Sequence, residues 1–175
     1  MKHVLLITGG PGTGKTTAIR KVAAGLAGRR RLAGFVTEEI RTAGARLGFR
    51  LVTFDGREAV LAHVGSRGSG RVGRYGVDVA AVDAVAASAL ALRDDRDVYI
   101  VDEIGNMECL SPVFVEAMRA LLGSPKPVVA TVARRGGGLI GEVKRRADAE
   151  LLVLTPRNRD ALPGRVLAWL GERSS

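Results

Sequence analysis

The chain has 175 residues, of which 46% are hydrophobic and 26% are charged, and its formal net charge is +9. These values fit a single soluble domain with a full-sized core, spanning residues 1–175, and argue against a disordered chain. No run approaches the roughly 18 apolar residues of a membrane span, and the first residues lead directly into an apolar strand. We therefore expect no membrane association, no signal peptide and a cytoplasmic location.

Cysteine, histidine and aromatic usage narrows the possible ligands. The single cysteine, Cys109, cannot form an intramolecular disulfide, and the only histidines, His3 and His63, have no further cysteine to complete a zinc site. We expect no structural metal. The positive charge could indicate a nucleic-acid partner, but arginine is scattered along the chain and aromatic residues make up only 4%. Few platforms remain on which bases could stack, so direct nucleic-acid binding is the less favoured interpretation.

The stretch from Val4 to Thr17, VLLITGGPGTGKTT, combines an apolar strand, a glycine-rich loop and the start of a helix. It matches the P-loop pattern G-x-x-x-x-G-K-[ST], in which backbone amides and a helix N-terminus converge on phosphate groups. Lys15 is predicted to contact the β- and γ-phosphates, and the Thr16 hydroxyl to bind Mg²⁺. The predicted nucleotide-binding residues of this stretch are Gly9, Gly10, Pro11, Gly12, Thr13, Gly14, Lys15, Thr16 and Thr17.

The residues after the P-loop predict one helix and then a β meander. Apolar residues recur with helical spacing up to about Gly28. Three strand-like runs follow, over residues 34–41, 47–54 and 58–64. Turn residues separate the runs at Ala43-Gly44 and Asp55-Gly56, which predicts antiparallel pairing.

Residues 65–76, GSRGSGRVGRYG, are rich in glycine and arginine, and this composition predicts a mobile loop. The loop could act as a lid that brings Arg71, Arg74 or Tyr75 over a bound nucleotide, or it could be a solvated connector. A helical pattern follows from Val79 to Leu92.

The run Val98 to Asp102, VYIVD, predicts a buried parallel strand that ends on a carboxylate and is followed by Glu103. In P-loop enzymes an aspartate at this position helps to hold Mg²⁺. A glutamate directly after it can orient and deprotonate the attacking water. Asp102 is thus predicted to be a metal ligand together with Thr16, and Glu103 to be catalytic together with Lys15.

The next strand is predicted over residues 127–132. Thr131, near its end, could sense the γ-phosphate or hold the catalytic water, or could simply reflect the β propensity of threonine. Arg134 follows at the same sheet edge and could neutralise charge that develops during phosphoryl transfer.

The C-terminal part predicts a short basic helix over residues 139–147, a strand over 150–154 and a final helical segment that Thr155-Pro156 opens. Pro163-Gly164 must bend or restart that segment, because proline clashes with the preceding turn. Asn158 and Arg159 emerge at the carboxyl end of the last strand, where ligands of open α/β sheets bind. They could contact the nucleotide base, or Asn158 could only cap a helix.

The order of these motifs resembles a known family. The resemblance rests on the following stretches: GGPGTGKTT at 9–17, GFVTEEIR at 34–41, GFRLV at 48–52, VGRYGVDV at 72–79, DEIGNME at 102–108 and LTPRNRD at 154–160. Together they resemble the nucleoside-triphosphatase family first described from thermophiles, whose human member is called cancer-related nucleoside-triphosphatase.

The resemblance implies a three-layer α/β P-loop fold with a RecA-like, mostly parallel sheet, helices on both faces and an antiparallel meander insertion. It also implies one further strand between the P-loop strand and the strand that carries Asp102, and Mg²⁺-dependent hydrolysis of ATP, GTP and other nucleoside triphosphates. By position, Asp102, Glu103, Ile104 and Gly105 would line the γ-phosphate side. The chain departs from the family pattern at Asn106, where lysine is common, and at Pro163-Gly164, within a helix that is usually unbroken.

Two other functions stay open at this stage. A small-molecule or nucleotide kinase is also a short P-loop domain, although a water-activating Glu103 would favour wasteful hydrolysis in it. A nucleotide-switched RNA-binding protein would use hydrolysis only to reset a conformation. If hydrolysis uses an arginine finger, the candidates are Arg71, Arg74, Arg134 or a residue from a neighbouring subunit.

Overall fold

The computed structural model describes residues 1–171. The strands are β1 Val4–Thr8, β2 Leu32–Thr42, β3 Ala45–Thr53, β4 Glu58–His63, β5 Gly70–Val72, β6 Tyr75–Val77, β7 Val98–Ile104, β8 Val128–Val132 and β9 Ala149–Val153. The helices are α1 Lys15–Leu26, α2 Val79–Ala89, α3 Pro112–Leu122, α4 Gly138–Lys144 and α5 Leu162–Gly171, with a short 3₁₀ helix, η1, at Glu108–Leu110.

Within this described part the nine strands form one sheet in the order β5-β6-β4-β3-β2-β7-β8-β1-β9. Pairing is parallel from β2 through β7, β8 and β1 to β9. It is antiparallel from β2 through β3, β4 and β6 to β5. Strand β8 therefore separates β1 from β7, as the resemblance implies. The carboxyl ends of the parallel strands meet at one edge, where open α/β sheets bind ligands.

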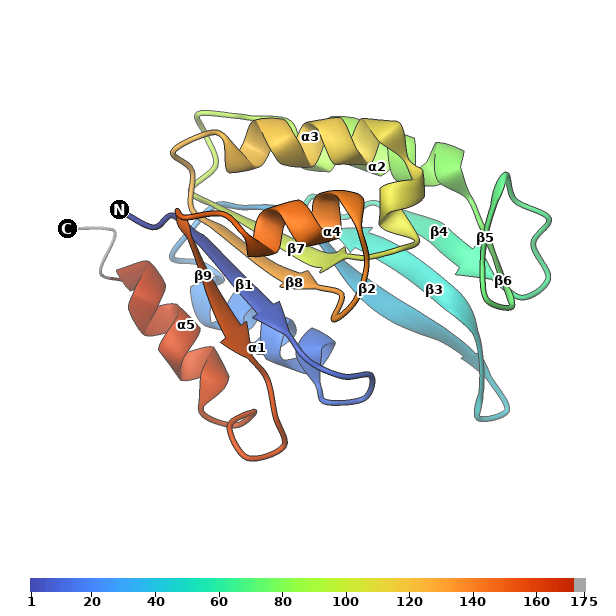
Figure 1. Cartoon of the computed structure of the whole chain (residues 1–175), viewed down its shortest axis with the longest axis horizontal. Coiled ribbons are helices and arrows are strands. Elements are labelled where there is room, and N and C mark those ends of the chain that lie inside the picture. The colour runs from blue at the N-terminus through green and yellow to red at the C-terminus, as the bar shows by residue number, and fades with distance from the viewer. Residues whose placement is uncertain (172–175) are drawn as a thin grey trace.

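Helices cover both faces of this sheet, which makes three layers (Figure 1). Helices α1 and α5 pack on one face, where the buried stripe of α1 comprises Ala18, Ile19, Val22 and Leu26. Helices α2, α3 and α4 cover the other face. Helix α3 starts at a cap, because the Ser111 hydroxyl accepts a hydrogen bond of 2.9 Å from the Phe114 amide and Pro112 follows the cap. The predicted α/β architecture is confirmed.

The meander is also confirmed, but the loop after it differs from the expectation. Residues 70–77 form the hairpin β5–β6, and β6 pairs with β4 through Ala62 and His63. A Cβ atom on Gly76 would overlap the carbonyl group of Ser66, and one on Gly70 would lie 2.7 Å from a methyl group of Leu110. The glycines thus allow close packing, and residues 70–76 form a hairpin where the sequence predicts a loop, while the mobility of this segment stays a prediction.

The last helix begins at the proline and is not interrupted by it. Leu162 is the first residue of α5 and Pro163 is the second. Proline is tolerated there because an amide in the first turn has no intrahelical partner. Pro163-Gly164 therefore lies at the start of α5, which agrees with the restart and not with the bend. None of the described helices is both long and apolar enough to cross a membrane.

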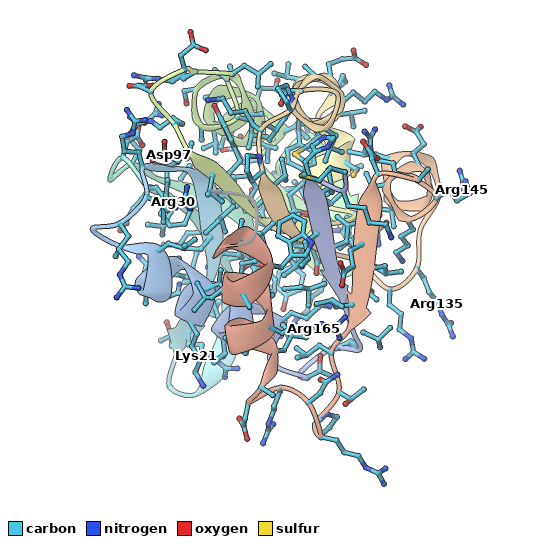
Figure 2. All side chains as sticks on the ribbon, turned by 90° about the vertical axis from the view of Figure 1, so that its left-hand side faces the viewer. Lys21, Arg30, Asp97, Arg135, Arg145 and Arg165 are labelled. Atoms are coloured by element: carbon cyan, nitrogen blue, oxygen red, sulfur yellow. The ribbon has the colours of Figure 1, made fainter. Side chains whose placement is uncertain are left out.

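Basic residues lie at several separate places on the molecule. In Figure 2 the labelled residues Lys21, Arg30, Arg135, Arg145 and Arg165 lie on different sides of the molecule. This distribution agrees with the scatter of arginine along the chain.

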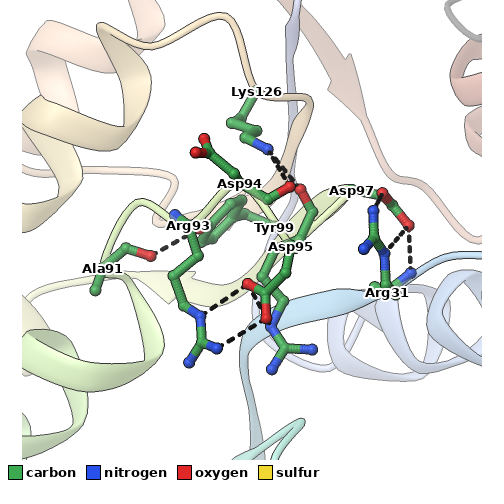
Figure 3. Close-up of polar contacts among 9 residues, drawn as sticks. Arg31, Ala91, Arg93, Asp94, Asp95, Asp97, Tyr99 and Lys126 are labelled. Carbon is green, nitrogen blue, oxygen red and sulfur yellow. Dashed lines mark hydrogen bonds and ion pairs between the residues drawn. The ribbon is translucent and has the colours of Figure 1, made fainter.

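Polar contacts secure the amino end of β7, opposite the edge where ligands are expected (Figure 3). The Tyr99 hydroxyl donates to the carbonyl of Ala91 at 2.7 Å and accepts from the amide of Arg93 at 2.9 Å. Arg31 binds Asp97 with two guanidinium contacts and its own amide, and these hydrogen bonds lower the pKa of the carboxyl to about 2. The contacts help to hold β7 in place, so that its carboxyl end is presented in a defined position.

Candidate nucleotide-binding site

The glycine-rich loop forms a tight curl between β1 and α1. Gly12 and Gly14 have φ angles of 71° and 98°, in the left-handed region that favours glycine. Thr13 closes the curl, because its hydroxyl donates to the carbonyl of Gly10 at 2.7 Å. The first helical hydrogen bond of α1 runs from the Ala18 amide to Gly14. The amides before Ala18 are therefore free of helical pairing and suit an anion.

Lys15 connects this loop to β7. Its Nζ donates to the carbonyl of Gly9 at 2.8 Å and lies 3.4 Å from Oε2 of Glu103. The lysine side chain is only 16% exposed. The cation is therefore held between the P-loop and the carboxylate that follows Asp102.

Asp102 lies at the centre of a buried hydrogen-bond network. Its Oδ1 accepts from the Thr131 hydroxyl at 2.7 Å and its Oδ2 from the Thr37 amide at 3.3 Å. The Thr37 hydroxyl also donates to the backbone carbonyl of Asp102. Burial raises the pKa of Asp102, against the lowering effect of hydrogen bonds from Thr131, Thr37 and Thr16. Thr131 thus contacts Asp102. Neither alternative that the sequence offered for Thr131, a contact with the γ-phosphate or the catalytic water, or simple β propensity, included this contact.

A β-bulge places Asp102 and Glu103 in the same hollow. Strand β7 continues two residues beyond the predicted end at Asp102, to Ile104. Val101 pairs with Ala130 and Ile104 with Val132, so that two residues of β7 stand opposite one of β8. Side chains of neighbouring strand residues normally point to opposite faces. Because of the bulge, both carboxylates line one cavity.

Glu108, which the sequence analysis did not assign a role, lies beside Glu103. A Cβ atom on Gly105 would be 2.7 Å from Oε1 of Glu103 and 2.8 Å from Oε2 of Glu108, so only glycine leaves room between the two groups. Burial and the nearby Glu103 raise the pKa of Glu108 to about 8. Burial also raises the pKa of Glu103, while Lys15 lowers it. No periodic pattern marks Glu108, since it opens a three-residue 3₁₀ helix.

Two basic residues approach the P-loop from the segment after β8. A guanidinium nitrogen of Arg134 lies 3.8 Å from the position that a Cβ atom on Gly10 would take. Lys144, at the end of α4, donates to the carbonyls of Ala133 at 2.5 Å and Arg134 at 2.8 Å. Lys144 therefore fixes the backbone that presents Arg134, and the sequence analysis missed it because the two residues are ten positions apart.

Arg71, Arg74 and Tyr75 do not lie at the P-loop. They belong to the β5–β6 hairpin, which β4, β3 and β2 separate from β7. The buried Tyr75 hydroxyl accepts hydrogen bonds of 3.1 Å from both Arg46 and Arg74, and Arg74 also donates to the carbonyl of Arg46. Arg71 is exposed. In this structure Arg74 and Tyr75 are thus held by contacts with Arg46, and the lid alternative stays a prediction.

Asn158 holds the turn after β9. Its Oδ1 accepts from the Thr155 amide and its Nδ2 donates to the carbonyl of Val153, both at 2.8 Å. The side chain caps a turn in this position and is not directed by these bonds toward a ligand. Arg159 is exposed in the same turn.

This combination defines a class of protein. The arrangement is typical of the phosphate site of a RecA-like P-loop nucleoside-triphosphatase: a glycine loop at a helix N-terminus, a lysine within it, and two carboxylates at the end of β7, which β8 separates from β1.

Comparison with known proteins identifies the family. The chain belongs to the NTPase family, whose sequence profile matches residues 4–167. It is 42% identical over 163 residues to the nucleoside-triphosphatase THEP1 of Thermofilum pendens, with 90% of each chain covered. It is 37% identical over 167 residues to the protein of the same name from Thermotoga sp. strain RQ2, with 95% of this chain and 94% of the relative covered.

Solved structures show the same similarity. The crystal structure of THEP1 from Aquifex aeolicus superposes with a TM-score of 0.85 at 37% identity, over 95% of this chain and 98% of the other. The solution structure of a human cancer-related nucleoside triphosphatase superposes with a TM-score of 0.81 at 33% identity, over 97% of each chain. The chain is thus an enzyme of the nucleoside-triphosphatase class.

Proposed function

We propose that this protein hydrolyses ATP, GTP and other nucleoside triphosphates to the diphosphate and inorganic phosphate, with Mg²⁺ as cofactor. The observation that carries the proposal is the position of Glu103, whose carboxylate lies 3.4 Å from the P-loop lysine. Binding alone would not need a carboxylate there. The names of the relatives, all nucleoside-triphosphatases, support the same reaction.

The residues around Asp102 fit a magnesium ion. Mg²⁺ prefers hard oxygen ligands and keeps several waters, so it needs only one or two protein groups beside the phosphates. The Asp102 carboxylate and the Thr16 hydroxyl supply such oxygens and interact with each other. The hydrogen bonds described for Asp102 come from hydroxyl and amide groups, so a cation can bind beside its carboxylate. Mg²⁺, when bound with the nucleotide, would neutralise charge on the β- and γ-phosphate oxygens.

The remaining residues perform the chemistry. A water attacks the γ-phosphorus in line, a new bond forms between the water oxygen and phosphorus, and the bond to the β-phosphate oxygen breaks. Glu103 accepts the proton of the water, and its raised pKa suits a general base that works near neutral pH. Lys15 and the amides of residues 9–17 stabilise charge on the phosphoryl oxygens. Ile104 and Gly105 line the γ-phosphate side behind the two carboxylates.

Thr131 and Thr37 orient Asp102, while Arg134 is placed to stabilise charge beside Gly10. The P-loop contacts phosphates only, so we expect hydrolysis of nucleoside triphosphates with several different bases. Neither Asn158 nor Arg159 is needed for phosphate binding.

Substitution Glu103→Gln tests the proposal, because it keeps the size of the side chain and removes the base. We expect phosphate release from ATP, GTP, CTP and UTP to fall by about 10²- to 10⁴-fold, while nucleotide binding persists. The matched control is Glu116→Gln on α3, whose carboxyl is 73% exposed and pairs with Arg119.

Steady-state phosphate release with Mg²⁺ gives the rates, and equilibrium binding of labelled nucleotide gives the affinity. Unchanged release in Glu103→Gln would refute the role of Glu103. Stoichiometric transfer of phosphate to an added nucleoside, nucleotide or sugar would instead show the chain to be a kinase.

A further inference from the structure

A cavity of about 280 Å³ lies next to the proposed phosphate site, between the meander and the turn that follows β7. On one side it is bounded by Thr16, Thr37, Asp102 and Glu103, which adjoin the P-loop. Its other side is made by residues to which the proposed hydrolysis assigns no role. The cavity is therefore larger than the space that a γ-phosphate, a metal ion and one water would use.

The unassigned side carries an apolar wall. Phe49 of β3, Leu61 of β4, Val72 of β5 and Met107 line it. The Phe49 ring is held by an edge contact with the Tyr75 ring, with centroids 5.3 Å apart, and by the Arg46 guanidinium, 5.3 Å from its centroid. Phosphate groups gain nothing from such a wall, whereas an apolar ligand gains about 25 cal/mol for each Å² that it covers.

The cavity is also lined by acidic residues. Asp102, Glu103 and Glu108 line it together with Asn106, and no lysine or arginine is among the residues that bound the cavity in the described chain. The carboxyl groups of Glu103 and Glu108 converge on either side of Gly105. Lys15 lies 3.4 Å from Oε2 of Glu103 but does not itself line the cavity, so an anionic ligand would meet mainly carboxyl groups. A hydroxyl or ammonium group would find several acceptors.

The adjacent hollow differs in chemistry. It has a volume of about 510 Å³ and is lined by Thr17, Arg20, Glu38 and Glu39, with Thr16, Thr37 and Phe49 shared between the two. Charged groups of both signs dominate it, so it does not discriminate against anions. Of these two cavities in the described chain, the smaller one combines apolar residues with carboxyl groups and is lined by no lysine or arginine.

We propose that the smaller cavity is a binding site for a second small molecule, with a ring-sized apolar body against Phe49, Leu61, Val72 and Met107 and an uncharged or cationic hydrogen-bond donor against Glu103 and Glu108. Its volume is near the lower end of small-molecule pockets, roughly 300 Å³, which limits the body to about one ring. The proposal goes beyond nucleoside triphosphate hydrolysis and does not depend on it.

Three probes that share one ring and differ in charge test the proposal: benzylamine, benzyl alcohol and benzoate. Their binding to the full chain without nucleotide is measured by ligand-observed NMR titration. We expect benzylamine and benzyl alcohol to bind and benzoate to bind at least about tenfold more weakly, a difference of about 1.4 kcal/mol. Equal binding of benzoate, or no binding of the other two, would overturn the proposal whether or not the chain hydrolyses nucleotides.

Variants locate the binding. Val72→Trp on the edge strand β5 fills the apolar part of the cavity, and Met107→Trp fills it from the turn after β7, so a folding defect in one variant leaves the other as a test. We expect either substitution to weaken benzylamine binding by about tenfold or more. The control is Val60→Trp on β4, whose side chain is 48% exposed and does not line the cavity. Unchanged binding in both filled variants would place the probe elsewhere and refute the site.

Discussion

At the scale of single residues, Glu108 makes stability depend on pH. Its pKa is raised to about 8 in the folded chain from an ordinary value of 4.5. Between these values the folded chain binds one more proton than the unfolded chain. The stabilising contribution is therefore complete below about pH 4.5 and is lost as the pH rises to about 8, by at most about 1.4 kcal/mol per pH unit.

Glu108→Gln removes this dependence, because glutamine is neutral at all pH values. Relative to the unsubstituted chain, we expect the variant to gain stability as the pH rises from about 5 to about 8. Urea unfolding across that range measures the free energy of unfolding. Glu58→Gln, at a side chain that is 59% exposed, is the control and should leave the pH dependence unaltered. A constant difference between the Glu108 variant and the original chain would contradict the assignment.

Thr131 acts through Asp102 and gives a second prediction at this scale. Thr131→Val keeps the shape of the side chain and removes the donor of the 2.7 Å hydrogen bond to the carboxylate. Loss of a partner at a buried polar group costs about 1–3 kcal/mol, and the carboxylate is no longer oriented toward Thr16. We expect half-maximal phosphate release to require more Mg²⁺, which a titration of Mg²⁺ against rate measures. The control is Thr42→Val, at an exposed site on β2. An unaltered Mg²⁺ requirement in Thr131→Val would show that Thr131 only fills space.

At the scale of elements, the contact between β2 and β7 joins the meander to the strands that carry the site. Gly34 of β2 has a φ of 99°, and a Cβ atom there would overlap the carbonyl oxygen of Ile100. Gly56, in the turn between β3 and β4, has a similar φ of 88° but open space around it. A comparison of substitutions at the two glycines therefore separates the cost of backbone strain from the cost of steric overlap between β2 and β7.

We expect Gly56→Ala to cost about 1–2 kcal/mol, the strain of an alanine in the left-handed region. Gly34→Ala should cost more than that, because β2 must also move away from β7. Denaturant unfolding of both variants measures the difference. Equal destabilisation would mean that the β2–β7 contact is not as close as the structure shows it.

At the scale of the whole molecule, a ligand that binds only the folded chain stabilises all of it. With Mg²⁺ and ADP at about 100 times the dissociation constant, the gain is about 2.7 kcal/mol, or roughly 5 to 10 °C in Tm for a chain of this size. Lys15→Ala removes the cation between the P-loop and Glu103, so we expect most of the shift to disappear. A thermal unfolding scan measures both chains. An equal shift in the variant would place the nucleotide away from the P-loop.

Much of the fold and the centre of the site could be predicted because their signals are local. Residues 4–17 contain the strand, the glycines and the lysine of the loop within one stretch, and turn pairs such as Asp55-Gly56 specify hairpins by backbone conformation alone. The run that ends in Asp102 and Glu103 is a similar short signal. The sequence by itself therefore determined the P-loop, the carboxylates opposite it and the α/β layers.

Tertiary structure decided what depends on residues that are far apart in the chain. The glycines in residues 65–76 predict a loop, whereas residues 70–76 form a hairpin, because the Leu110 and Ser66 groups that they accommodate cannot be inferred from composition. Thr131 contacts Asp102 only because of the register between β7 and β8. Lys144 contacts the backbone at Arg134 only because α4 folds back to the end of β8. The high pKa of Glu108 is likewise a property of its burial beside Glu103. Short-range patterns encode backbone conformation, whereas hydrogen-bond partners, burial and cavities arise only when the sheet is assembled.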